Sequence, residues 1–83
     1  MTQESLYLED IIKPIVSKPE SVKIKQTTDE RGILLTLTVH KEDTGLIIGK
    51  QGETARAIRR LIRLFGVINN QRLSIRITDH TKT

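Results

Sequence analysis

The sequence contains no cysteine and no tryptophan, and it has a single tyrosine and a single phenylalanine. The absence of cysteine excludes disulfides, zinc–thiolate sites and thiol catalysis. With so few aromatic rings, the chain offers almost no platform for stacking bases, which argues against RRM and OB-type binders. The two histidines, His40 and His80, are too few and too far apart to suggest a metal site. We therefore expect neither a metal nor a cofactor.

Long apolar runs are also missing from the chain. No stretch approaches the roughly 20 apolar residues of a membrane-spanning helix, and the N-terminus lacks the basic-then-apolar order of a signal peptide. We expect a cytoplasmic protein without membrane association. The sequence has no evident nucleophile–base pair, metal set or paired carboxylates, so we expect no enzymatic activity.

What the chain does have is positive charge on a single small domain. Its 83 residues leave no room for a second core, so we expect one domain over residues 1–83 with a core of about 6–78. The net charge of +4 favours a polyanionic partner. Many small basic proteins have no nucleic-acid role, so charge alone does not decide the function.

The first part of the chain predicts a helix that a proline interrupts. Residues 1–4 are expected to fray, and Ser5 is a plausible N-cap. Pro14 favours either one bent helix or a break near Lys13, ending before Pro19. The helical spacing of apolar residues defines one stripe: Leu8, Ile11, Ile12, Ile15 and Val16.

Three segments alternate with the period of a strand. Residues 22–27 and 33–39 flank turn chemistry at Asp29 to Gly32, which predicts an antiparallel hairpin. A last strand follows the turn at residues 69–71, and the two helices before it allow a parallel, right-handed crossover. The expected inward residues of the last two strands are Ile33, Leu35, Leu37, Val39, Leu73, Ile75 and Ile77. Residues 80–83 are expected to form a tail.

The stretch between these strands contains the main functional candidate, the loop Gly49-Lys50-Gln51-Gly52. A short helix capped by Asp43 is expected to precede the loop. Gly52, the second glycine of the loop, opens another helix. The first amides of that helix lack internal partners, so they form a suitable binding site for a phosphate. Arg56 and Arg59 could reach the same phosphate, whereas Arg63 is as readily a solvated residue. The expected buried stripe of this second helix is Ala55, Ile58, Leu61, Ile62 and Phe65.

Other glycine-rich motifs fit this stretch poorly. A Walker A loop needs four residues between its first glycine and Gly-Lys, but only three separate Gly45 from Gly49, and Gln51 follows the lysine. A dinucleotide fingerprint fails because Ile47 stands where its glycine pair requires a glycine. The Gly45–Gly49 spacing also occurs in membrane helices, but no apolar 20-mer surrounds it.

The motif Ile47-Ile48-Gly49-Lys50-Gln51-Gly52 followed by a helix resembles the KH domain. The predicted order helix–strand–strand–helix–helix–strand is similar to its type II (prokaryotic) form, an α+β fold with three helices on one face of a three-stranded mixed sheet. More narrowly, the chain resembles the small bacterial KhpA family through Ile12 to Val16, Pro19 to Val22 and Glu42 to Arg59. Thr44 and residues 65–70 depart mildly from that family.

The resemblance implies single-stranded RNA binding without catalysis. It implies that Gly49, Lys50, Gln51 and Gly52 contact the RNA backbone, while Ile47, Ile48, Ala55 and Ile58 form or support an apolar floor, although core packing alone would also explain these four. It further implies RNA chaperoning, a role in cell elongation and division, and pairing with a second copy or a larger KhpB, Jag or EloR protein. The alternative is a protein–protein adaptor that mainly forms homodimers or heterodimers.

Overall fold

The computed structural model describes residues 2–79, apart from the side chains of Lys50 and Asp79. The predicted tail at 80–83, including His80, lies outside this range. Single turns of 3-10 helix span Pro19–Ser21 and Lys41–Asp43, whereas Lys50–Gly52 is a tight turn in which Gln51 leaves the helical region (φ 56°, ψ 25°). The main elements are α1 (Gln3–Ile12), β1 (Lys23–Asp29), β2 (Gly32–Val39), α2 (Thr44–Ile48), α3 (Glu53–Ile68) and β3 (Leu73–Asp79). This order is the predicted one.

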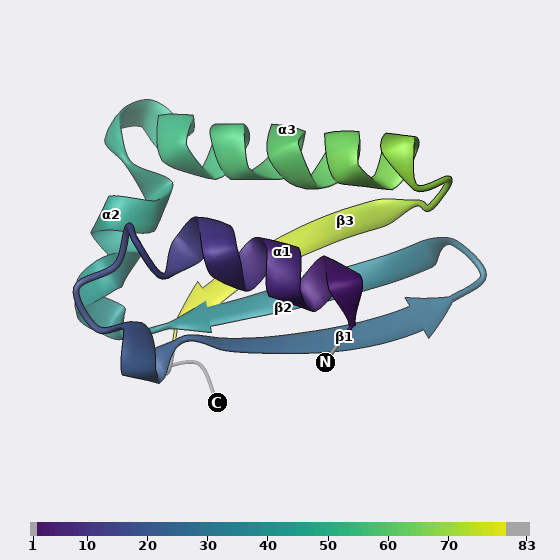
Figure 1. The fold of residues 1–83 in the computed structure, drawn as a ribbon. Helices are drawn as coiled ribbons and strands as arrows, with labels where there is room; N and C mark the ends of the chain where they lie inside the picture. The colour runs from purple at the N-terminus through teal and green to yellow at the C-terminus, as the bar shows by residue number, and fades with distance from the viewer. Residues whose placement is uncertain (1, 80–83) are drawn as a thin grey trace.

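The strands form one mixed sheet in the order β1-β2-β3. β1 pairs antiparallel with β2, and β2 pairs parallel with β3, as the hairpin and crossover predicted. All three helices lie over the same face of this sheet (Figure 1). The predicted α+β architecture with three helices on one face is therefore confirmed.

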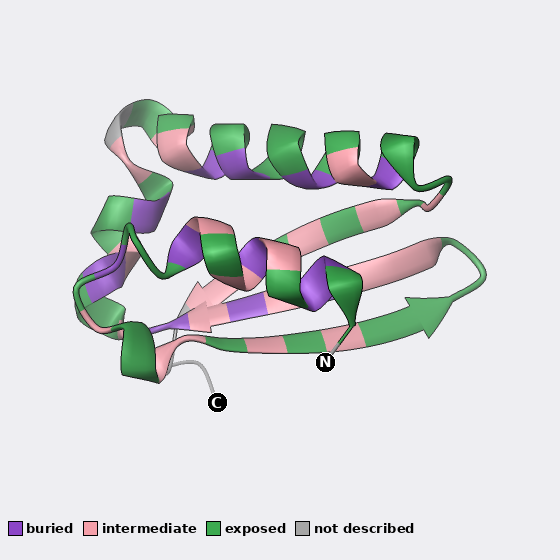
Figure 2. Ribbon diagram, viewed as in Figure 1, coloured by how far each residue is buried: buried purple, intermediate pink, exposed green. Residues whose placement is uncertain are grey.

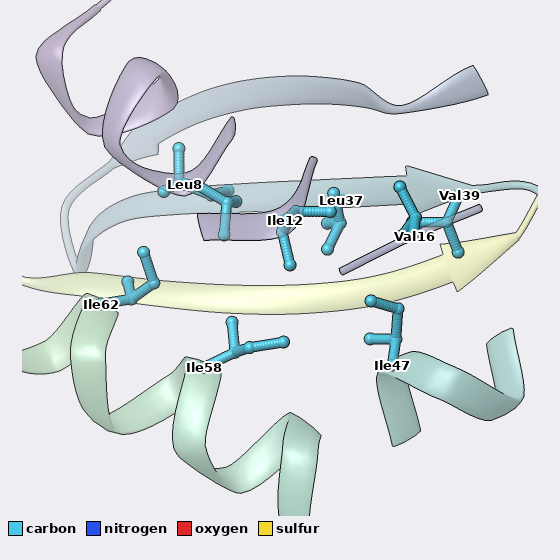
Figure 3. Packing of buried hydrophobic residues seen from close by; sticks show 9 residues of the cluster. Leu8, Ile12, Val16, Leu37, Val39, Ile47, Ile58 and Ile62 are labelled. Carbon is cyan, nitrogen blue, oxygen red and sulfur yellow. The ribbon is translucent and has the colours of Figure 1, made fainter. Parts of the chain in front are cut away.

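The core lies between the central strand and the three helices. Leu35, Leu37 and Val39 of β2 are fully buried, as their alternation predicted. Each helix contributes apolar side chains to the same cluster, most of them visible in Figure 3: Leu8, Ile12, Ile47, Ile58 and Ile62.

The start of α1 differs from the prediction. The helix begins at Gln3 with Thr2 as its N-cap, so residues 3 and 4 are helical rather than frayed and Ser5 is not the cap. The hydroxyls of Thr2 and Ser5 both donate to Oε1 of Gln26 on β1. This long-range contact holds the first turn against the sheet, and nothing local in the sequence signals it.

α1 ends at Ile12, before Pro14, so the chain breaks at the proline rather than bending through it. Beyond the break Val16 is buried, whereas Ile15 is exposed and does not join the expected stripe.

The buried face of α3 also differs from the predicted stripe. Ala55, Ile58, Ile62 and Gly66 are buried, but Leu61 is exposed. Phe65 is half-buried because its ring stacks on that of Tyr7 from α1, with centroids 4.6 Å apart. The buried stripe is thus rotated away from Leu61, and Figure 2 shows exposed positions along the side of α3 that faces away from the sheet.

Candidate nucleic-acid interface

The loop between α2 and α3 has the backbone conformation that its glycines favour. Gly49 (φ 67°) and Gly52 (φ 73°) both have positive φ, as does Gln51 between them (φ 56°). The amide of Gly49 donates to the carbonyl of Gly45 at 2.8 Å, which closes α2, and α3 starts directly after Gly52. The chain therefore reverses within four residues.

The two glycines serve different purposes. A Cβ on Gly49 would stand 2.5 Å from Oγ1 and 3.1 Å from the backbone nitrogen of Thr54, so this position must remain a glycine for the loop to pack on α3. A Cβ on Gly52 would meet nothing within 4 Å. Gly52 is thus open on its side-chain face, with space for a ligand to approach the backbone.

Gly52 is the N-cap of α3 and forms no side-chain capping bond. The first amides of a helix have no intrahelical acceptors, and they lie at the positive end of its dipole. In α3 this end opens onto the loop. Anionic oxygens are the ligands that such a terminus accepts. The Lys50 side chain lies outside the described part of the structure.

The apolar candidates near the loop separate into core and surface residues. Ile47 is fully buried, and Ile58 and Ala55 are almost so, which makes core packing sufficient to explain their apolar character. Ile48 instead exposes 47% of its surface directly before the loop. Leu46 exposes a similar share, which sequence analysis missed because a five-residue helix shows no clear periodicity.

Four arginines lie on the solvent side of α3: Arg56, Arg59, Arg60 and Arg63. Together they line one shallow depression, so the four positive side chains share one patch of the helix surface. Among the side chains that the structure describes, none forms an ion pair with any of these arginines. The structure thus groups Arg60 and Arg63 with the predicted Arg56 and Arg59.

A hollow of about 220 Å³ lies between α3 and β3. Arg59, Ile62 and Arg63 line it from the helix, and Leu73, Ser74 and Ile75 line it from the strand. β3 is an edge strand, so one side of its backbone has no partner strand. Sequence analysis assigned no site residue to β3, because only the packing of α3 over this strand creates the hollow.

The part of the chain that the structure describes contains neither a cluster of metal-ligating side chains nor a membrane-spanning helix. No three His, Asp or Glu residues gather there as metal ligands would. No helix in that part is long and apolar enough to cross a membrane.

Sequence comparisons with known proteins agree on one family. The model of the "KhpA/KhpB, KH domain" family matches residues 5–77. The RNA-binding protein KhpA of Bacillus subtilis is 39% identical to this chain, over 88% of the chain and 95% of the relative. The KhpA protein of Clostridium acetobutylicum is 43% identical, over 84% and 93%. A crystal structure of Era from Aquifex aeolicus shares the fold, with a TM-score of 0.68 and 16% identity over 92% of this chain and 30% of that one.

Proposed function

Because this chain belongs to the KhpA/KhpB family of KH domains, which is not a family of enzymes, we propose that it binds single-stranded RNA at the loop Gly49 to Gly52. The observation that carries the proposal is the uncapped N-terminus of α3 behind an open Gly52. RNA phosphates bind there through the first amides of the helix, and a KH loop of this kind clamps about four nucleotides.

The surroundings of the loop suit the rest of a short RNA strand. Bases that follow the gripped phosphates lie over Ile48 and enter the hollow between α3 and β3. Arg59 and Arg63 at the rim of that hollow supply donors for phosphate or base oxygens. Without aromatic platforms, one copy binds weakly and with little sequence preference.

A salt titration of short single-stranded RNAs tests this function. Each phosphate that the protein neutralises contributes about −0.7 to the log–log salt slope. We expect micromolar binding with a slope of roughly −2 to −3. In the Gly52→Asp variant a carboxylate at the open glycine repels the phosphates, and binding is lost.

The matched control is Gly52→Ala, which also places a side chain at positive φ but adds no charge. We expect it to keep most of its affinity. Gly49→Asp is a poorer probe, because any side chain there collides with Thr54. Retained RNA affinity in a folded Gly52→Asp variant would contradict the proposal.

We further propose that the protein pairs with a second copy or with a larger KhpB, Jag or EloR protein, and acts with it in the cytoplasm as an RNA chaperone in elongation and division. The supporting observation is the apolar flank of α3, where Leu61, Leu64 and Ile68 expose 38%, 52% and 69% of their surfaces. Linking two weak RNA sites in this way raises the overall affinity.

Size exclusion with light scattering tests the pairing. Leu64→Lys places a charge at the centre of this flank, and we expect it to yield monomers where the unmodified protein forms dimers. If dimers persist in Leu64→Lys, the flank is not the interface. A stable, salt-resistant dimer that binds no RNA would favour the adaptor function instead.

A further inference from the structure

The sheet has a second face that none of the described helices covers (Figure 1). The residues of this uncovered face follow from the alternation of side chains along each strand. Gln26 on β1 contacts Ser5 of α1, so its neighbours Lys25 and Thr27 point the opposite way. On β2, burial of Leu35 and Leu37 leaves Thr36 on that opposite face.

The strand register arranges this face in three rows across β1, β2 and β3. The rows are Lys23–Thr38–Thr78, Lys25–Thr36–Arg76 and Thr27–Leu34–Ser74. Three of these nine positions are cationic, five carry hydroxyls and none is acidic. The nearest acid on the same side of β1 is Asp29 at the hairpin, where its carboxylate accepts the Arg31 amide at 2.8 Å.

The cations of this face are exposed and have no ion pair among the side chains that the structure describes, whereas Lys13 and Lys18 on the helix side each pair with a glutamate. Lys25 and Arg76 flank Thr36, about 10 Å apart across two strand spacings. Unpaired cations separated by hydroxyls complement a chain of phosphates, which accepts hydrogen bonds at each oxygen.

This face is continuous with the hollow beside α3. Ser74 lines that hollow and also belongs to the uncovered face, two residues before Arg76 on the same edge strand. An RNA strand that leaves the hollow around the free edge of β3 therefore meets Arg76 first and Lys25 next.

We infer that the uncovered sheet face, centred on Lys25, Thr36 and Arg76, is a second binding surface for the RNA backbone. The inference rests on the RNA-binding function proposed above and extends it. An RNA of about four nucleotides fills the loop groove alone. A longer RNA continues onto the sheet, so its affinity depends on these cations and that of the short RNA does not.

The test measures fluorescence anisotropy with RNAs of about 5 and about 20 nucleotides. The variant Lys25→Gln/Arg76→Gln removes two cations from the face, and Lys13→Gln/Lys18→Gln removes two from the helix side as a matched control. For the long RNA we expect roughly tenfold weaker binding and a salt slope flatter by about 1.4 in the first variant only. Binding of the short RNA should be equal in both.

Equal binding of the long RNA by both double variants would overturn the inference, and so would a failure of the unmodified protein to bind the long RNA more tightly than the short one. If only the long RNA binds, and Lys25→Gln/Arg76→Gln abolishes that binding, the result supports RNA binding by the sheet face and contradicts RNA binding at the loop. NMR on the unmodified protein is independent of the variants: the amides of Thr36 and Arg76 should shift with the long RNA alone.

Discussion

The carboxylate of Asp43 accepts hydrogen bonds from both the backbone N–H and the hydroxyl of Ser17, at 2.9 and 2.6 Å. Its second oxygen accepts the N–H of Lys18 at 3.0 Å. Asp43 is fully buried and stands at the N-cap position of α2, yet its side chain makes no capping bond, contrary to the sequence prediction. It ties the segment after α1 to the start of the helix that leads into the loop.

Replacing Asp43 should destabilise the whole domain. Asp43→Ala leaves two backbone donors and a hydroxyl without their acceptor, whereas Asp43→Asn removes the charge and replaces one of the two accepting oxygens by a donor amide. We expect the melting temperature to fall by roughly 5–10 °C in Asp43→Ala and by less in Asp43→Asn. Ser17→Ala removes only the hydroxyl bond and serves as the mild member of the series. An unchanged melting temperature in Asp43→Ala would contradict this role.

The same contacts predict how stability depends on pH. The hydroxyl and backbone N–H groups of Ser17 hold the pKa of Asp43 below its ordinary range. A carboxyl whose pKa is lower in the folded state stabilises the protein above the unfolded pKa, and that contribution disappears as the pH falls through the folded pKa. Urea unfolding should therefore show a loss of stability below about pH 4, and Asp43→Asn should flatten this dependence.

The two loop glycines should differ in their effect on folding. Gly52→Ala meets no neighbour and should cost only the strain of positive φ, about 1–2 kcal/mol. Gly49→Ala adds a collision with Thr54 and should cost more. Thr54→Ala removes the closest clashing atom, so the cost of Gly49→Ala should shrink in that background. A double-mutant cycle by urea unfolding measures this coupling.

Substitutions of Ile47 and Ile48, directly before the loop, should have different effects: one on stability and the other on RNA binding. Ile47→Ala empties a fully buried position and should cost roughly 2–5 kcal/mol of unfolding free energy. Ile48→Ala removes an exposed side chain, so it should leave stability almost unchanged and weaken binding of short RNA. Equal RNA affinity in Ile48→Ala would exclude this residue from the apolar floor.

Glu53 should oppose RNA binding at the loop. Its exposed carboxylate lies in the first turn of α3, next to the amides that face the phosphates. Glu53→Gln removes this repulsion, and we expect affinity for short RNA to rise severalfold at low salt, with the difference fading at high salt. The control is Glu20→Gln, which removes the same charge from the single turn before β1, a segment distant in the sequence from the loop.

Sequence reasoning succeeded where a local pattern governs the structure. The loop lies between two helices because Gly49 and Gly52 permit positive φ, and both residues adopt it. The alternation of Leu35 and Leu37 correctly predicted the buried face of β2. Pro14 predicted either a bend or a break near Lys13, and the break is the one that occurs, because proline has no N–H for the helical hydrogen bond.

Prediction from the sequence failed where a side chain bonds to a residue that is distant in the sequence. Thr2 and Ser5 are held by Gln26 on β1, and the carboxylate of Asp43 turns to Ser17 instead of capping its own helix. Neighbouring residues do not reveal either partner. Ser, Thr and Asp can cap their own helix or bond to a residue far along the chain, and the local sequence is the same in both cases.

The element order, the strand faces and the glycine loop could all be predicted before the structure, since each follows from backbone preferences and apolar periodicity over a few residues. The side of α3 that packs on β3 could be known only from the folded chain, and so could the rim of Arg59 and Arg63 and the exposure of Leu61. The rotation of a helix on a sheet is set by the best packing of all its apolar neighbours together, and those neighbours come from every part of the chain.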